Sequence, residues 1–174
     1  MSKVHVHESL PGSADAVWSF FRDFGGVQKF AGPMVKSCSI EGNGIGAVRT
    51  IALAQGNPIR ERLVQFDDAD RSFSYAIIGP RDLPVADYVG TVKLRADAAK
   101  RTTIDWIGTF DPAGAPEPDV LRMIEGIYRG GIAAIKAALY AGPAVADAYT
   151  GTNGADTLHG AAGNDTLYGR DGND

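Results

Sequence analysis

Three polar side chains lie on strand faces that are otherwise apolar, where they could act on a bound molecule. Side chains of a β-strand alternate between its two faces. By this alternation Glu61 shares a face with Ile59 and Leu63, and Lys36 and Tyr88 also fall on apolar faces. Burying a charge is costly unless it is paired or solvated. These groups therefore indicate either a small-molecule cavity with a few polar groups, or structural ion pairs and strand ends that reach solvent.

Glu61 with Tyr88 or Tyr75 is also a potential acid–base pair. An apolar cavity raises the pKa of a carboxylic acid toward the range that is useful for proton transfer. No nucleophile–base pair is visible in the sequence beside these residues. Two functions therefore stay open: a ligand-binding domain, and a cofactor-independent cyclase, dehydratase or lyase with Glu61 and Tyr88 as its catalytic residues.

His5 and His7 are two residues apart, so both are expected on one face of a strand. Because no third ligand is evident in the sequence, we expect exposed edge histidines rather than a metal site. The third histidine, His159, belongs to a repeat near the C-terminus. The single cysteine, Cys38, excludes an intrachain disulfide and a multi-cysteine zinc site. We therefore expect no cofactor in the main domain.

The elements that must position these residues follow the order strand, short helices, several strands, long helix. Strands are expected over Lys3–Leu10, Met34–Glu41, Ala47–Ala54, Ile59–Asp67, Ser72–Ile78, Val85–Arg95 and Thr102–Asp111. Ser13 suits the N-cap of a short helix that ends at Phe21. Apolar residues at helical spacing predict a long helix over Pro116–Tyr140. This order predicts an α+β domain whose curved antiparallel sheet packs on one helix.

Such a packing leaves room for a cavity between sheet and helix. Strand alternation and the 3.6-residue helical spacing direct one set of side chains into it. The expected lining residues are Glu61, Tyr75, Tyr88, Trp106, Ile124 and Tyr128.

Composition limits the function classes. With 174 residues, of which 44% are hydrophobic and 22% charged, the chain can bury one sizeable core. A net charge of −4 without a Lys/Arg cluster argues against a nucleic-acid partner. No apolar run approaches the roughly 20 residues of a membrane span, and the N-terminus lacks a signal-peptide h-region. We therefore expect a cytoplasmic monomer or dimer.

A nine-residue period begins at Gly151, with Gly at positions one and four, Asp at position six and Leu at position eight. The sixth position is held by Asp156, Asp165 and Asp174. The preceding Ala/Gly/Pro-rich segment is typical of a linker. The expected organisation is a ligand-binding domain over residues 1–142, a linker over 143–150 and partial repeats over 151–174.

Short motifs keep the order and spacing of a known family. They are Val17-Trp18-Ser19, Val35-Lys36-Ser37-Cys38-Ser39-Ile40, Gly46-Ala47-Val48-Arg49, Glu61-Arg62-Leu63, Asp67-Asp68, Tyr75-Ala76-Ile77-Ile78-Gly79 and Asp87-Tyr88. With these motifs, residues 3–140 resemble the START-like, Bet v 1-related helix-grip (SRPBCC) superfamily. The resemblance is greatest to polyketide cyclase/dehydrase-type bacterial members and plant abscisic-acid receptors. It implies a seven-stranded antiparallel sheet wrapped around a long C-terminal helix, with a small apolar or amphipathic molecule held between them.

Residue by residue, the resemblance implies a binding site with polar groups and apolar walls. The matching positions are Glu61, Tyr75, Ile77, Tyr88, Ile124 and Tyr128. The departures are specific: the lysine that pairs with the hormone falls at Gly32, with Lys36 further along, and Gly90 and Gly108 replace a serine and a glutamate. The gate is shorter and the latch is replaced by residues 81–85. We therefore expect a ligand-binding site that includes Lys36 and Trp106, and no hormone-receptor function.

The repeat resembles the RTX, or haemolysin-type, calcium repeat Gly-Gly-x-Gly-x-Asp-x-Leu-x. The resemblance implies Ca²⁺ ligands at Asp156, Asp165 and Asp174 and short Thr-Leu strands of a parallel β-roll. Because such a stack usually needs about three full repeats, we expect at most one weak site, formed by the turns Gly151–Asp156 and Gly169–Asp174, and a mobile tail without metal. The alternatives are a disordered or truncated array, and a secreted calcium-binding protein exported through a C-terminal RTX-type route.

Overall fold

The computed structural model describes residues 1–79, 82–97, 101–141, 148–150 and 166–168. The chain divides into two units, Met1–Lys136 and Ala137–Asp174. Helix α2 (Glu117–Ala141) begins in the first unit, and the division falls within its last turns.

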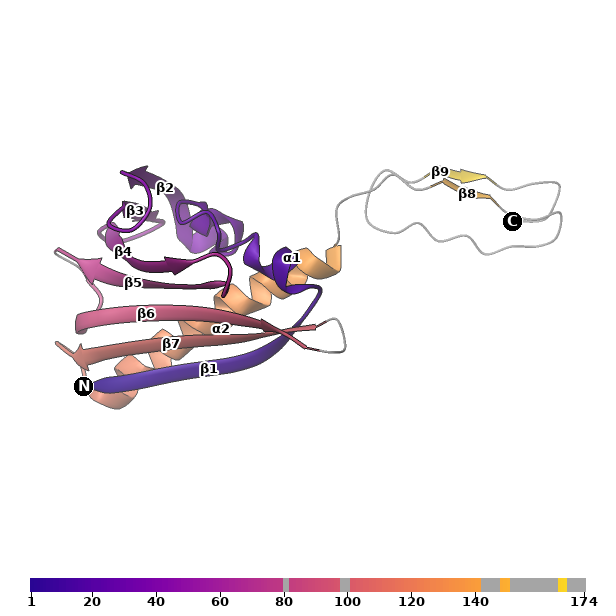
Figure 1. Ribbon diagram of the computed structural model, residues 1–174. Helices are drawn as coiled ribbons and strands as arrows, with labels where there is room; N and C mark the ends of the chain where they lie inside the picture. Colours follow the sequence, from indigo (N-terminus) through magenta and orange to yellow (C-terminus); the bar gives the residue numbers. More distant parts are fainter. Residues whose placement is uncertain (80–81, 98–100, 142–147, 151–165, 169–174) are drawn as a thin grey trace. The chain divides into compact units, whose positions relative to one another are not determined.

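The first unit is built on a seven-stranded antiparallel sheet that curves around α2 (Figure 1). Its strands are β1 (Ser2–Pro11), β2 (Val35–Glu41), β3 (Val48–Leu53), β4 (Ile59–Asp67), β5 (Ser72–Ile78), β6 (Val85–Ala96) and β7 (Arg101–Pro112). They lie in the order β1-β7-β6-β5-β4-β3-β2, so β2 to β7 form a meander and β1 adds to its β7 edge. The helix-grip fold expected from the sequence is confirmed.

Alternating burial explains why these segments form a one-sided sheet. In β1, Val4 and Val6 are buried whereas His5 and His7 are exposed. The same alternation runs through β7, where every second residue from Thr102 to Phe110 is buried. One face of the sheet therefore belongs to the core and the other to solvent.

Helix α2 packs one apolar stripe against the inner face of the sheet. The buried residues of this stripe are Val120, Ile124, Tyr128, Gly131, Ile132 and Ile135. They recur every three or four residues, which puts them on one side of a helix. Full burial of a large apolar side chain contributes about 1.5–3 kcal/mol, so the stripe holds α2 on the sheet.

Three short helical segments connect β1 to β2: α1 (Ala14–Trp18), η1 (Gly26–Lys29) and η2 (Gly32–Met34). Ser13 caps α1 as expected, since its side chain accepts a hydrogen bond from the Ala16 N–H at 3.2 Å. The helix is shorter than expected and ends at Trp18, after which Phe21 packs against Phe73 and Trp106.

The second unit contains a pair of short parallel strands, β8 (Ala148–Thr150) and β9 (Thr166–Tyr168). Strand β9 covers one of the Thr-Leu positions expected to be extended, whereas β8 falls inside the segment expected to be a linker. Tyr149 pairs with Leu167, which is two nine-residue periods further along the chain. Asp156, Asp165 and Asp174 lie outside the described residues.

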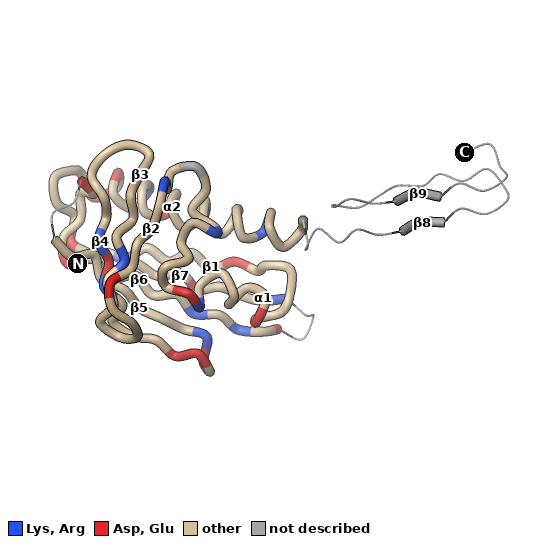
Figure 2. Tube along the Cα trace, turned by 90° about the horizontal axis from the view of Figure 1, so that it is seen from above, with Lys and Arg blue, Asp and Glu red and all other residues tan. Residues whose placement is uncertain are grey.

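Lys and Arg are interspersed with Asp and Glu along the first unit (Figure 2). Several of these charges are paired across elements, as in Arg22–Asp68 and Arg71–Asp15. Of the helices that the structure describes, none is both long and apolar enough to span a membrane.

Candidate functional site

A cavity of about 250 Å³ lies between the inner face of the sheet and α2. Seven of the eight residues expected to bind a ligand line it: Glu61, Tyr75, Ile77, Tyr88, Trp106, Ile124 and Tyr128. Most of the remaining wall is aliphatic or aromatic, with Val27, Phe30, Met34, Val35, Ile51, Leu53, Ile59, Leu83 and Ile127. This volume lies just below the usual range of ligand pockets, about 300–1,000 Å³.

Lys36 is the exception, because it is exposed and is not among the residues that line the cavity. The pairing of β2 with β3 shifts register between Val35 and Ser37, so Lys36 is the extra residue of a bulge. A bulge breaks the alternation on which the prediction for Lys36 depended. Lys36 therefore lies outside this cavity wall, and Val35 contributes to the wall in its place.

Three tyrosines and a tryptophan form a hydrogen-bonded cluster in the cavity wall. Trp106 Nε1 donates to Tyr75 Oη at 3.2 Å, and Tyr75 Oη lies 3.5 Å from Tyr88 Oη. Tyr88 Oη is hydrogen-bonded in turn to Tyr128 Oη, and the Tyr128 ring stacks on Trp106 with centroids 4.6 Å apart. The cluster connects strands β5, β6 and β7 to α2.

Burial raises the pKa of all three tyrosines, and that of Tyr88 lies well above its ordinary value. Near neutral pH the three side chains are therefore phenols that donate and accept hydrogen bonds.

Two glycines make room for the tyrosine hydroxyls. Gly90 pairs with Tyr75 on one side and with Gly108 on the other. A Cβ at Gly90 would lie 2.4 Å from Tyr75 Cζ, and one at Gly108 would lie 2.4 Å from Tyr128 Oη. At these two positions, where the resemblance has polar side chains, the phenol groups of neighbouring elements occupy the space.

Glu61 points inward as expected, but it is paired with a buried cation, Arg49. The two residues are direct cross-strand partners on β3 and β4, and only 5% of Arg49 and 7% of Glu61 is exposed. Arg49 Nε donates to Glu61 Oε2 at 2.6 Å, and Nη1 donates to the Phe24 carbonyl at 2.9 Å. The guanidinium also lies 4.2 Å from the centroid of the Phe24 ring. Each charge therefore has a partner inside the protein, as a buried charge requires.

Arg49 also lines the cavity, although no site role was expected for it from the sequence. The sequence pattern could have identified Arg49 as inward-facing, because on the expected strand it shares a face with Ala47 and Ile51. A cation on that apolar face matches the anion of Glu61 on the next strand.

Two exposed apolar side chains show where the cavity reaches the surface. Met34 is 66% exposed and Ile127 is 43% exposed, and both belong to the lining.

Two loops at the cavity are joined by hydrogen bonds next to the lining residue Leu83. Asp82 accepts one from the backbone N–H of Asn57 at 2.8 Å and one from the Asn57 side-chain amide at 2.9 Å. These bonds lower the pKa of Asp82 and tie the β3–β4 loop to the β5–β6 loop.

The hydrogen bonds of Glu61 within the described part of the chain do not include a tyrosine, which matters for the hypothesis that Glu61 and Tyr88 act as an acid–base pair. Among the hydrogen bonds of the described residues, Glu61 is joined to Arg49 and to no tyrosine. The cavity therefore brings Glu61 and Tyr88 to one wall without joining them as a proton-transfer pair.

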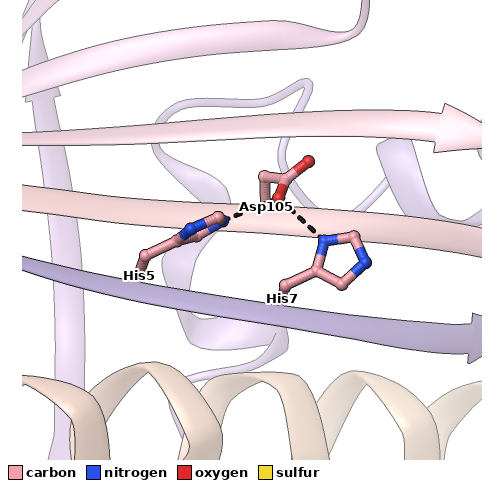
Figure 3. Close-up of side chains that lie close together, drawn as sticks. All are labelled: His5, His7 and Asp105. Carbon is pink, nitrogen blue, oxygen red and sulfur yellow. Dashed lines mark hydrogen bonds and ion pairs between the residues drawn. The ribbon is translucent and has the colours of Figure 1, made fainter.

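The histidines lie on the other face of the sheet, where the structure supplies a third polar group. His5 and His7 of β1 both contact the carboxylate of Asp105 on β7 (Figure 3). Asp105 is a third polar group that the sequence did not reveal, and both histidine rings are exposed as expected.

Comparisons with known proteins agree with the fold and with the repeats. Residues 1–140 match the family described as polyketide cyclase/dehydrase and lipid transport, and residues 146–174 match the RTX calcium-binding nonapeptide repeat. No curated protein matches the chain.

Three solved structures are similar to the first unit. A protein from Bacillus thuringiensis is 26% identical, with a TM-score of 0.71 over 78% of this chain and 97% of that chain. The protein XoxI from Bacillus cereus is also 26% identical, with a TM-score of 0.72 over 79% of this chain and 94% of that chain. A protein from Nitrosospira multiformis, 23% identical with a TM-score of 0.66 over 78% of this chain and 94% of that chain, shares the fold.

Proposed function

The chain belongs to the polyketide cyclase/dehydrase and lipid transport family, and on that basis we propose that its cavity binds a small, uncharged apolar or amphipathic molecule. The observation that carries the proposal is the composition of the wall. It is mostly aliphatic and aromatic, with one ion pair and one tyrosine cluster as its polar features.

The buried polar atoms of the cavity wall already have partners inside the protein. Among the described residues, no buried side-chain nitrogen or oxygen lacks a hydrogen-bond partner. An apolar ligand can therefore enter without leaving a polar group unpaired, which would cost about 1–3 kcal/mol. A ligand that needed strong polar contacts with Glu61 or with the tyrosine cluster would have to compete with bonds that the protein makes with itself.

Arg49 offers a place for the polar end of an amphipathic ligand. A guanidinium has five N–H donors, and the bonds to Glu61 and Phe24 use one on Nε and one on Nη1. A carbonyl or hydroxyl oxygen can accept from the others. An anionic ligand would face the carboxylate of Glu61 as well, so we expect uncharged molecules to bind more tightly.

Binding of N-phenyl-1-naphthylamine, an uncharged apolar dye, tests this function. Gly126 lines the cavity, is exposed, and has open space around the position of a Cβ. Gly126→Phe should therefore put a ring at the cavity and weaken dye binding at least about tenfold, the equivalent of 1.4 kcal/mol. The matched control is Ala133→Phe, at an exposed position of α2 outside the lining, which should leave binding unchanged. Equal binding by both variants would contradict the proposal.

The second candidate is a cyclase, dehydratase or lyase, and it is favoured by the presence of Glu61 and Tyr88 in one cavity wall. Native mass spectrometry of the purified chain identifies a co-purifying molecule, which is then followed with Glu61→Gln and Tyr88→Phe. An enzyme should lose most of its turnover in both variants. A binding domain should show no turnover and should keep its dye affinity in Tyr88→Phe.

The repeats of the second unit suggest calcium binding, and we place a single weak site between the turns Gly151–Asp156 and Gly169–Asp174. These turns follow β8 and β9 directly, and the two strands are paired in parallel. The parallel register supports stacking of turns that are two periods apart. Carboxylate and carbonyl oxygens from two turns suit Ca²⁺, which takes six to eight oxygen ligands.

A further inference from the structure

Strand pairing brings three potential metal ligands together on the outer face of the sheet. His7 lies directly opposite Asp105 in the β1–β7 ladder, and His5 lies opposite Ile107. Val4 and Val6 point into the core, so the two histidines point away from it. One ligand atom from each of His5, His7 and Asp105 lies within 4.8 Å of the others.

Both imidazoles already converge on one oxygen. His5 Nε2 and His7 Nδ1 donate to Asp105 Oδ1 at 2.7 and 2.8 Å, and Figure 3 shows the two rings pointing toward the carboxylate. Ligand atoms around a tetrahedral zinc ion lie about 3.3 Å apart, since Zn–N and Zn–O bonds are about 2.0–2.2 Å. A metal ion therefore needs each nitrogen to retreat by only about half an ångström from the oxygen.

Besides this small movement, replacing the hydrogen bonds by metal bonds requires a change of tautomer. His5 Nε2 and His7 Nδ1 give up their protons to bind the metal, and the other ring nitrogens carry the proton instead. The His5 and His7 side chains are 42% and 59% exposed, so their rings have room to turn. The exposed side also leaves a coordination position for water.

The surroundings hold the carboxylate in place. The Asp105 side chain is only 13% exposed, and Arg95 Nη1 lies 3.7 Å from its other oxygen, Oδ2. This contact leaves Oδ1 directed at the histidines. Residues that contact a metal ligand from behind commonly orient it in this way. Lys93, the cross-strand neighbour of Asp105 on β6, is engaged with Asp70 instead.

We propose that His5, His7 and Asp105 form a binding site for one zinc-class divalent ion on the outer face of the sheet. Two imidazoles and one carboxylate suit Zn²⁺ and similar transition ions, whereas Ca²⁺ prefers a shell made of oxygens alone. The site is therefore chemically distinct from the calcium repeats. It is also separate from the cavity, because its ligands occupy the opposite face of the sheet.

Titration of ZnCl₂ into the full chain, with excess CaCl₂ present to occupy the repeats, tests the proposal. The wild-type chain should bind one zinc ion that His5→Ala or His7→Ala weakens at least about 100-fold. The matched control is His159→Ala, which removes the remaining histidine of the chain and should leave this affinity unchanged. Co²⁺ should give a visible absorption band that the His5 and His7 variants lose.

A second measurement guards against effects on folding. Zn²⁺ should raise the Tm of the wild-type chain and of His159→Ala, because a ligand of the folded state alone stabilises that state. It should not raise the Tm of His7→Ala, whose Tm without metal reports whether the variant is folded. Absence of zinc binding by the folded wild-type chain, or equal affinity in the His5 and His159 variants, would overturn the proposal.

Discussion

At the scale of single residues, two glycines shape the cavity as much as the side chains that line it. Gly90 and Gly108 are paired on β6 and β7, and the space above them holds the phenol groups of Tyr75 and Tyr128. The tyrosine cluster depends on this space, because each hydroxyl lies where a Cβ would otherwise be.

Gly90→Ala should therefore destabilise the fold. Its Cβ would lie 2.4 Å from Tyr75 Cζ, which forces the ring to move and costs about 1–3 kcal/mol of unfolding free energy. Urea unfolding measures the change. The matched control is Gly130→Ala on α2, where a Cβ meets nothing within 4 Å. This substitution should raise the free energy of unfolding by about 0.5–1 kcal/mol, because alanine has the higher helix propensity. If Gly90→Ala is as stable as the wild-type chain, the close approach is not needed for packing.

At the scale of elements, charges at one edge of the sheet connect strand β1 to α2. Glu8 of β1 accepts hydrogen bonds from Lys136 and from Arg129 Nη1, the latter at 2.8 Å. The two donors are seven residues apart on the helix, which is about two turns. Glu8 therefore connects the two ends of this helical segment to the edge strand.

Glu8→Gln should lower the free energy of unfolding by about 1 kcal/mol at pH 7. The Lys136 hydrogen bond, opposed by burial, lowers the pKa of Glu8 below its ordinary value of 4.5. A carboxyl group with a lowered folded-state pKa stabilises the protein above the unfolded value and loses this contribution as the pH falls through the folded value. The difference between wild type and Glu8→Gln should therefore shrink below about pH 4.5.

Urea midpoints at pH 7, 5 and 3 check this dependence. Glu125→Gln is the control, because Glu125 is 45% exposed and pairs with Arg129 on its own helix. Its loss should cost less than about 0.5 kcal/mol. Equal effects of the two substitutions at every pH would show that Glu8 does not anchor the helix to the sheet.

At the scale of the whole molecule, a domain of the polyketide cyclase/dehydrase and lipid transport family and a set of RTX calcium-binding nonapeptide repeats share one chain. The two family matches end and begin at residues 140 and 146. The parallel pairing of β8 with β9 joins, inside the second unit, segments that are two nine-residue periods apart in the sequence. The division into residues 1–142, 143–150 and 151–174 stays a proposal, and strand β8 (Ala148–Thr150) lies at the end of its middle segment.

Calcium binding by the full chain should depend on alternate repeats. Asp156→Asn and Asp174→Asn should each weaken the site, because both carboxylates belong to turns that follow β8 and β9. Asp165→Asn is the matched control and should leave binding unchanged, since the proposed site uses only the repeats of Asp156 and Asp174. Isothermal titration with CaCl₂ measures the affinities. Submicromolar binding by the wild-type chain, or an equal loss in Asp165→Asn, would contradict a single weak site.

The sequence by itself determined the elements and most of the residues that face the cavity. Alternation of apolar residues identified the strands, and helical spacing identified α2 to within a residue or two at each end. The inward positions of Glu61, Tyr75 and Tyr88 followed from the same alternation. These features could be predicted because periodicity is a local property of the chain, and one buried face per element is enough to produce it.

Tertiary structure alone decided which side chains meet. The bulge at Lys36 and the pairing of Glu61 with Arg49 depend on strand register. So does the meeting of His5 with Asp105, which is 100 residues away in the sequence. Alternation tells which face a side chain occupies but not which neighbour lies across the ladder, and a shift of one residue changes every such neighbour. Contacts between strands are therefore set by the packing of the whole domain.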